Sequence, residues 1–203
     1  FAIKPQIAEE VLKKFIDYKF NKKCTFISII AGKKINFFHK YLPATNNFIR
    51  VMPNMPALID YGMTCLFTKK NLSIKTKDNI NSLFSALGKT LWLKSEKDID
   101  KVTAISGSGP GYIFFIIDAF EKAALTLGLG EKNTKKLVHQ TLLGSIHLLL
   151  NESLTAEKLA NKIAVKGGTT EAGLNQFKKN KTLHTVFKKA VEAAYKRANQ
   201  LGK

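Results

Sequence analysis

The hydrophobic pattern of the chain changes near residue 96, and this change constrains the fold more than any other feature. Before it, short apolar runs ending at Gly or Pro alternate with amphipathic segments, which is the pattern of α/β proteins with a parallel sheet. After it, every hydrophobic period is helical. We therefore predict an α/β part over residues 1–96 and an all-helical domain over residues 97–203.

Four strands and three helices are expected in the first part. Pro53 and Pro56 forbid continuation of the second strand, and Gly88 is expected to cap the third helix. The predicted helices cover residues 4–20, 33–42 and 76–88, and the predicted strands cover 24–32, 48–52, 62–68 and 90–94.

The helices of the second part are unusually apolar. Residues 114–117 read Phe-Phe-Ile-Ile, and residues 148–150 are three leucines. A helix that is apolar on every side has to be surrounded. Because a bundle of five or six helices cannot surround them all, we predict a homodimer with an intertwined helical interface, although a monomeric core remains the alternative.

The formal charge of +18 suggests nucleic acid at first sight. However, Arg50 and Arg197 are the only arginines among the 33 basic residues, and the lysines are spread along the whole chain. Arginine supplies the bidentate contacts of specific readers. We interpret the charge as compositional drift and predict no nucleic-acid partner.

Other functional classes lack their signatures. No apolar run is long enough to cross a membrane, and the histidines lack metal-ligand spacing. Cys24 and Cys65 lie in apolar runs, as reduced cysteines of a cytoplasmic protein do. The chain begins with Phe1 and shows no signal peptide, so it looks cut within a domain.

The stretch Lys166–Leu174, KGGTTEAGL, enters a predicted helix through two glycines and two threonines. The first amides of a helix have no internal partner and carry the positive end of its dipole, so they attract a carboxylate or phosphate. One threonine is expected to cap the helix, which leaves the other hydroxyl for a ligand. A plain helix cap with a tight turn is the alternative, and spacing alone favours it.

Two further stretches combine glycine or proline with polar groups. Ser106–Pro110, SGSGP, is either a phosphate-type nest or a loop whose glycines allow close helix crossing before Pro110 opens a helix. Residues 52–56, MPNMP, follow a strand at the carboxyl end of the sheet, where α/β sheets bind ligands. There Asn54 either donates to a ligand or closes an Asx-turn.

Taken together, these motifs closely resemble the pyrroline-5-carboxylate reductase family. The segments AIKP, SIIAG, RVMPNMPALIDYGMT, DKVTAISGSGPGYIFFIIDAF and KGGTTEAGL follow one another in the family's order over essentially the whole chain. The resemblance implies reduction of 1-pyrroline-5-carboxylate to L-proline by NAD(P)H, with NADPH favoured over NADH. It also implies a Rossmann domain followed by a helical dimerisation domain, in homodimers or decamers, in the cytoplasm and without a metal.

The resemblance also implies roles for individual residues. Thr170 would be catalytic, with its hydroxyl on the ring nitrogen of the substrate. The implied substrate-binding residues are Gly167, Gly168, Thr169, Thr170, Ser106 and Ser108. The implied cofactor-binding residues are Ala2, Ile3, Lys4, Pro5, Ile29, Ile30 and Ala31.

The sequence departs from the family pattern in two places. Ala164 and Val165 stand where the family usually has Thr-Ser. The glycine-rich strand-turn-helix at the front of the family, about 30 residues or more, is not in this sequence, so we expect an incomplete Rossmann sheet. The alternatives are a non-catalytic relative that keeps the dimerisation module, and a reductase of another cyclic imine or of a β-hydroxyacid. The threonine pair favours the pyrroline acid.

Overall fold

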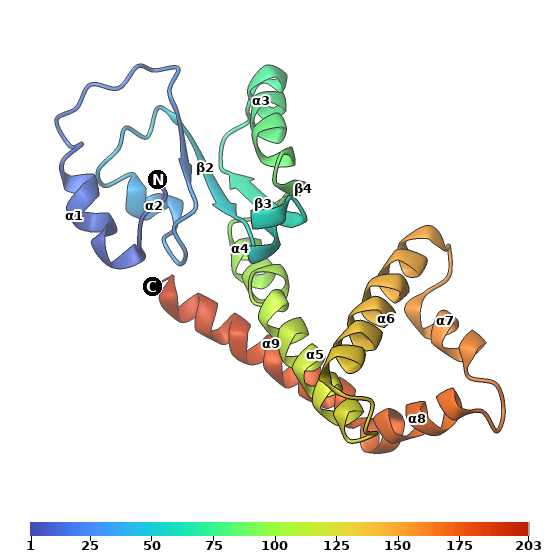
Figure 1. Cartoon of the computed structure of the whole chain (residues 1–203). Coiled ribbons are helices and arrows are strands. Elements are labelled where there is room, and N and C mark those ends of the chain that lie inside the picture. Colours follow the sequence, from blue (N-terminus) through green and yellow to red (C-terminus); the bar gives the residue numbers. More distant parts are fainter. Residues whose placement is uncertain (203) are drawn as a thin grey trace. The chain divides into compact units, whose positions relative to one another are not determined.

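The computed structural model describes residues 1–202, apart from the side chain of residue 181. Contacts divide the chain into two compact units. The first unit holds residues 1–110 together with the chain from residue 190 onward, and the second holds residues 111–189. Figure 1 shows the ribbon with every α-helix and most strands labelled.

The first unit is built on a four-stranded sheet in the order β1-β2-β3-β4. The β1–β2 and β3–β4 pairs are parallel, as expected, but the β2–β3 pair is antiparallel. The reason is the short connection from Met52 to Gly62, because a parallel crossover needs about a dozen residues or more. The strands are β1 (Thr25–Ser28), β2 (Asn47–Met52), β3 (Gly62–Thr68) and β4 (Gly88–Trp92).

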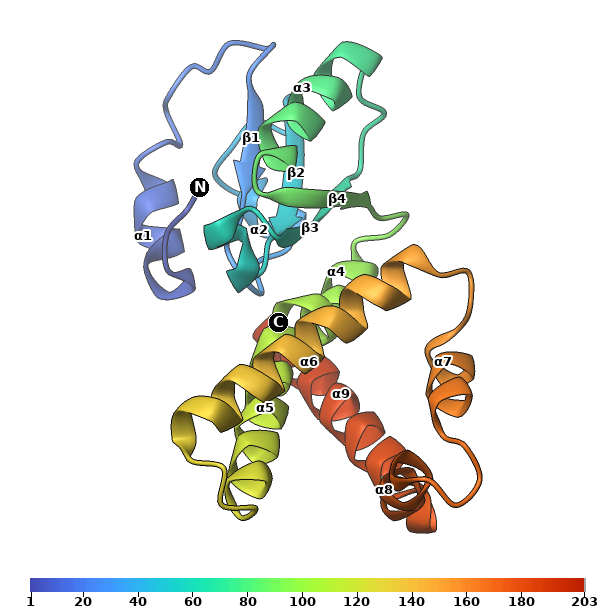
Figure 2. The ribbon, with the colours of Figure 1, turned by 45° about the vertical axis from the view of Figure 1, so that its right-hand side comes forward.

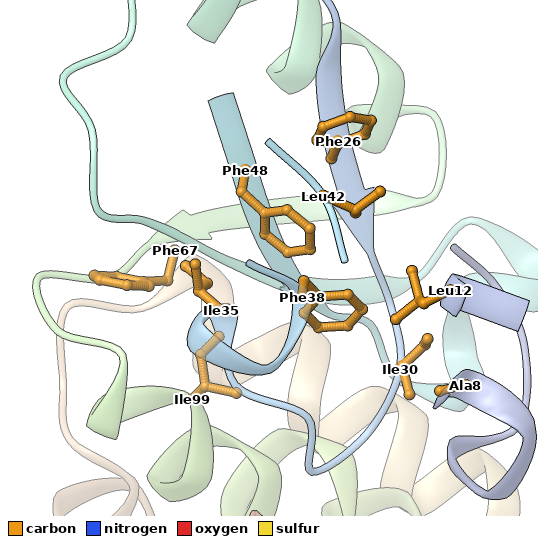
Figure 3. Packing of buried hydrophobic residues seen from close by; sticks show 10 residues of the cluster. All are labelled: Ala8, Leu12, Phe26, Ile30, Ile35, Phe38, Leu42, Phe48, Phe67 and Ile99. Carbon is orange, nitrogen blue, oxygen red and sulfur yellow. The ribbon is translucent and has the colours of Figure 1, made fainter. Parts of the chain in front are cut away.

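Helices cover both faces of this sheet. Ile80 and Phe84 of α3 (Ile74–Ser85) pack on Ile49, Val51 and Leu66 of the strands. The opposite face carries the larger core, whose ten buried side chains are drawn in Figure 3. The helical residues of this core come from α1 (Ala8–Lys13), α2 (Ile35–Phe38) and α4 (Lys97–Val102). The unit also contains two short 3₁₀ helices, η1 (Pro5–Ile7) and η2 (Met55–Ile59).

Two local predictions in this unit are wrong. The helix expected over residues 4–20 ends at Lys13, because the chain turns so that Phe20 packs edge-on against Phe26, with ring centroids 4.8 Å apart. Gly88 is not a helix cap but opens β4 with a φ of 127°. A Cβ atom there would clash with the backbone of Gly62 on β3, so the close approach of the two strands requires glycine.

The second unit is entirely helical, as predicted. It contains most of α5 (Gly109–Leu125) and then α6 (Glu131–Asn151), α7 (Ala156–Ile163), α8 (Thr169–Lys178), η4 (Lys179–Lys181) and the first part of α9 (Thr182–Leu201). Figure 2 shows α7 joined to its neighbours by extended chain on both sides. Among the described side chains of this unit, only Thr134 and Val138 are buried. Because this unit buries so few of its own side chains, its exposed apolar side chains are available to pack against another protein surface.

The SGSGP stretch is not the loop that the sequence suggested. Residues Thr103–Gly107 form a π-helical turn between α4 and α5, and Gly109 already begins α5. The amide of Ser108 donates to the carbonyl of Thr103 at 2.8 Å. Because this amide is used inside the helix, the geometry does not support a phosphate-type nest. Single π-helical turns inside helices often lie at functional sites.

Candidate functional site

The start of α8 provides a partly exposed group of polar atoms in the second unit. Gly168 is the N-cap residue, and the amides of Thr169, Thr170 and Glu171 have no carbonyl one turn earlier to bond with. Gly167 has a φ of 75°, the left-handed conformation that glycine adopts without strain. Thr169 is exposed and Thr170 is half-buried. The corner therefore offers amide donors and hydroxyls at the positive end of a helix dipole.

The expected threonine cap is absent. No side chain caps Gly168, and the Glu171 carboxylate instead accepts the amide of Gly167 at 2.8 Å. This contact resembles the reverse half of a capping box. The amide of Gly168 also has a partner, because it donates to the carbonyl of Val165 at 2.9 Å. Both threonines thus belong to the first helical turn, and neither hydroxyl serves as the cap.

The two stretches implied for the cofactor meet in the first unit. The amide of Ile29, just after β1, donates to the carbonyl of Phe1 at 3.0 Å, so residues 1–5 begin beside the end of this strand. Ala2, Lys4, Ile29 and Ala31 are exposed there. Ile30 is different, since it is buried in the hydrophobic core. This strand end is the position where α/β sheets bind ligands.

The π-helical turn is fixed to the sheet by Asn54. The Asn54 side chain accepts the amide of Met63 at 2.8 Å and donates to the carbonyl of Ser106 at 3.1 Å. Its side-chain oxygen therefore does not close an Asx-turn, one of the two roles that the sequence suggested. The Ser106 hydroxyl donates to the carbonyl of Val102 at 3.2 Å. Two of the stretches that the sequence singled out, MPNMP and SGSGP, thus lie together in the fold.

Cys65 lies beside this turn on β3. Its side chain is buried, and burial raises the pKa of its thiol, while a hydrogen bond with Ser106 opposes that rise. Cys24 is half-buried, and both cysteines are free thiols. The structure joins the two cysteines by no disulfide, and their reduced state stays a prediction.

A buried ionic group on the same face was not recognised in the sequence. Arg50 of β2 is 2% exposed and lies 3.4 Å from Asp100 and 3.6 Å from Glu96. Glu96 also accepts the amide of Ile35 at 2.7 Å and so holds the start of α2. The available signal was one arginine within an apolar strand, in a chain whose other basic residues are nearly all lysine.

The described residues, 1–202, contain neither a metal-binding cluster nor a membrane-spanning helix. No group of three His, Cys, Asp or Glu side chains is arranged to hold a metal ion. No helix in this part of the chain is long and apolar enough to span a bilayer.

Comparison with known proteins identifies the relatives of this chain. Residues 96–201 match the sequence model of the pyrroline-5-carboxylate reductase dimerisation domain. Pyrroline-5-carboxylate reductase of Haemophilus influenzae is 34% identical over 201 residues, which are 98% of this chain and 73% of the relative. The chain belongs to the pyrroline-5-carboxylate reductase family. The Rossmann-like fold and helical dimerisation domain that the resemblance implied are thereby confirmed.

Solved structures of the family agree along nearly the whole chain. A pyrroline-5-carboxylate reductase from Coxiella burnetii superposes with a TM-score of 0.89 at 33% identity, covering 99% of this chain and 74% of that one. Pyrroline carboxylate reductase of Plasmodium falciparum, solved with NADP bound, gives 0.86 at 32% identity and covers 99% and 75%. This chain therefore spans about three quarters of the length of these reductases. The family consists of oxidoreductases.

Proposed function

We propose that this protein reduces 1-pyrroline-5-carboxylate to L-proline with NAD(P)H, the last step of proline biosynthesis. Membership of the reductase family supports the reaction class. The observation that carries the proposal is the accessible start of α8, where neither threonine hydroxyl is used as the helix cap. A small anionic imino acid matches this group of donors in size and charge.

Each group at this corner has a proposed task. The amides of Thr169 and Thr170, which have no carbonyl partner within the helix, hold the substrate carboxylate, since backbone amides at a helix start favour an anion. The Thr170 hydroxyl bonds the ring nitrogen and fixes the orientation of the C=N bond. Orientation of this kind supplies much of the catalytic effect when two bound reactants must meet. Gly167 and Gly168 allow the backbone to approach the ring, and Ser106 and Ser108 complete the proposed substrate-binding set.

The nicotinamide cofactor is assigned to residues 2–5 and 29–31. The meeting of these two stretches at the end of β1, with exposed residues on both, fits the nicotinamide end of a dinucleotide. When bound, the cofactor supplies the hydride, and the protein supplies position and electrostatics. The NADP in the Plasmodium falciparum relative supports NADPH as the preferred form.

The helical part is assigned to self-association. We propose residues 1–96 as the C-terminal portion of the dinucleotide-binding domain and residues 97–203 as the dimerisation and substrate-binding domain. Exposed apolar side chains of α5 and α6 support a homodimer, and assembly into decamers is a further proposal from the family resemblance. The proposed location is the cytoplasm. Among the apolar side chains of α5 and α6, the most exposed are Phe115, Leu150 and Ile146.

The proposal is tested by replacing Thr170 in the full-length protein. Thr170→Ala is expected to lower kcat for the imine about 100-fold, because one oriented hydrogen bond to the reacting group is lost. Thr170→Ser, which keeps the hydroxyl, should restore most of the rate. Oxidation of NADPH is followed by absorbance, and dimer mass is followed by light scattering.

Thr155→Ala is the matched control. Thr155 caps α7 in the same unit by accepting the amide of Lys158 at 3.3 Å, so its loss should lower the melting temperature but leave kcat unchanged. Equal loss of turnover and of dimer in Thr170→Ala would contradict the role of Thr170. A full-length protein that dimerises but does not oxidise NADPH with the imine would establish the non-catalytic alternative.

A further inference from the structure

One side chain joins the end of the sheet to the segment that carries Ser106 and Ser108. Asn54 follows β2, is half-buried, and makes one hydrogen bond in each direction. Its side-chain oxygen accepts a hydrogen bond from the backbone N–H of Met63 on β3. Its side-chain nitrogen donates a hydrogen bond to the backbone carbonyl of Ser106. The carbonyl it holds therefore belongs to one of the residues assigned to the substrate.

A π-helical turn needs such a partner more than an ordinary helical turn does. Its wider ring shifts the carbonyls out of the α-helical register, so some groups have to be satisfied from outside the helix. Here the turn is stabilised from within by the Ser108 amide on the Thr103 carbonyl and by the Thr103 hydroxyl on the Ile99 carbonyl, at 2.8 and 2.7 Å. The Asn54 amide adds the contact from the sheet.

The π-helical turn is also held by close packing against β2, β3 and α4. A Cβ atom added to Gly107 would lie 2.8 Å from the terminal methyl of Met52, so the turn packs closely against the end of β2. On β3, the thiol of Cys65 contacts the Ser106 side chain. Helix α4, which leads into the turn, is fixed to β2 through Asp100 and Arg50, and Figure 1 shows α4 directly below the end of that strand.

We propose that Asn54 is a positioning residue for substrate binding: by holding the Ser106 carbonyl, it sets the place of Ser106 and Ser108. This inference rests on the proposed reductase function. Asn54 does not contact the substrate in this proposal. It affects substrate binding by holding the π-helical turn in place. An error of about 1 Å in a positioned group is enough to cost about 100-fold in rate or affinity.

Asn54→Asp in the full-length protein separates the two halves of this bridge. The carboxylate keeps an acceptor for the Met63 amide but loses the donor, and it repels the Ser106 carbonyl. We expect the KM for the imine to rise about tenfold, the KM for NADPH to stay within about twofold, and the melting temperature to change by only a few degrees. Asn54→Ala should raise the imine KM similarly and also lower the melting temperature, because the Met63 amide then loses its partner.

Asn81→Asp is the matched control on the opposite face of the sheet. Asn81 of α3 accepts the indole N–H of Trp92 at 2.7 Å, and aspartate keeps that acceptor. Both kinetic constants should stay at their original values. A KM increase for both substrates together in Asn54→Asp, or an unchanged imine KM, would overturn the inference. If the unsubstituted protein does not reduce the imine, the proposed function itself is wrong. The role of Asn54 in holding the π-helical turn is then decided by thiol labelling, which does not depend on turnover.

Thiol labelling tests the same inference without turnover. Cys65 is 1% exposed beneath the π-helical turn, whereas Cys24 lies beside β1 and serves as an internal reference. Asn54→Asp should increase the labelling rate of Cys65 at least fivefold relative to Cys24, measured by peptide mass spectrometry under native conditions. An unchanged ratio would show that Asn54 does not hold the turn, whatever the kinetic result.

Discussion

His39 shows how the surroundings of a single residue set its charge. Its ring packs against Phe48 with centroids 6.0 Å apart, and Nδ1 is buried without a hydrogen-bond partner within the described part of the chain. Burial lowers the pKa of His39, and the positive charges of Lys69 and Lys70 lower it further, while Glu96 acts in the opposite direction. The fold therefore favours the neutral ring.

The first residue-scale prediction concerns acid stability. Because the unfolded chain binds a proton at His39 more readily than the fold does, stability from this residue is complete above about pH 6.5 and declines as the pH falls from there toward the lower folded pKa. His39→Gln should make the urea midpoint fall less between pH 7.5 and pH 5.5 than it does in the original protein. His184→Gln, on the exposed surface of α9, is the control and should leave the decline unchanged. An identical decline in His39→Gln would contradict the assignment.

At the scale of elements, the buried ionic group of Arg50 connects three segments that are distant in sequence. Arg50 is on β2, Asp100 is inside α4, and Glu96 precedes α4 while also holding the first amide of α2. Each segment is short, and a helix of four or six residues is not stable alone. The ionic group thus fixes the places of α2 and α4 on the sheet, in addition to the hydrophobic core.

Asp100→Ala is predicted to destabilise the fold by about 3–5 kcal/mol, because the guanidinium of Arg50 would stay buried without its closest partner. The double variant Arg50→Met with Asp100→Leu should recover most of that loss, since a well-packed apolar pair avoids the cost of burying charge. Asp98→Ala on the same helix removes an exposed ion pair with Lys101 and should have a much smaller effect. Urea unfolding measures all three, and an Asp100→Ala protein as stable as Asp98→Ala would refute the role.

At the scale of the whole molecule, the two units are stabilised in different ways. The first unit encloses two clusters of buried apolar side chains, one on each face of the sheet. In the second unit, large side chains remain exposed on consecutive helices, including Phe115 at 74% and Leu150 at 71%. Monomeric proteins rarely expose apolar surface over so many neighbouring positions. The match to a dimerisation domain fits this surface.

Phe115→Glu is predicted to weaken the homodimer at least tenfold, because a charge would have to be buried in the apolar interface. Ile74→Glu is the matched control, since Ile74 is 81% exposed at the start of α3 in the other unit. It should leave the dimer intact. Sedimentation over a range of protein concentrations measures both association constants. Equal behaviour of the two variants would place the interface elsewhere.

The sequence alone determined the order and kind of the elements. β3 lies at the predicted residues, and β2 starts one residue earlier than predicted, because Pro and Gly mark strand ends through local backbone sterics. The helical character of the second half followed from its 3.6-residue period. The family and the accessible start of α8 were also readable, since the order of motifs and the amides of a helix start are properties of the chain itself.

Only the tertiary structure decided how these elements use their polar groups. The antiparallel β2–β3 pair, the π-helical turn at Thr103–Gly107 and the two hydrogen bonds of Asn54 depend on residues that are distant in sequence. The same is true of the Arg50 group. A side-chain donor or acceptor has several possible partners along an unfolded chain, and packing selects among them only when the elements come together.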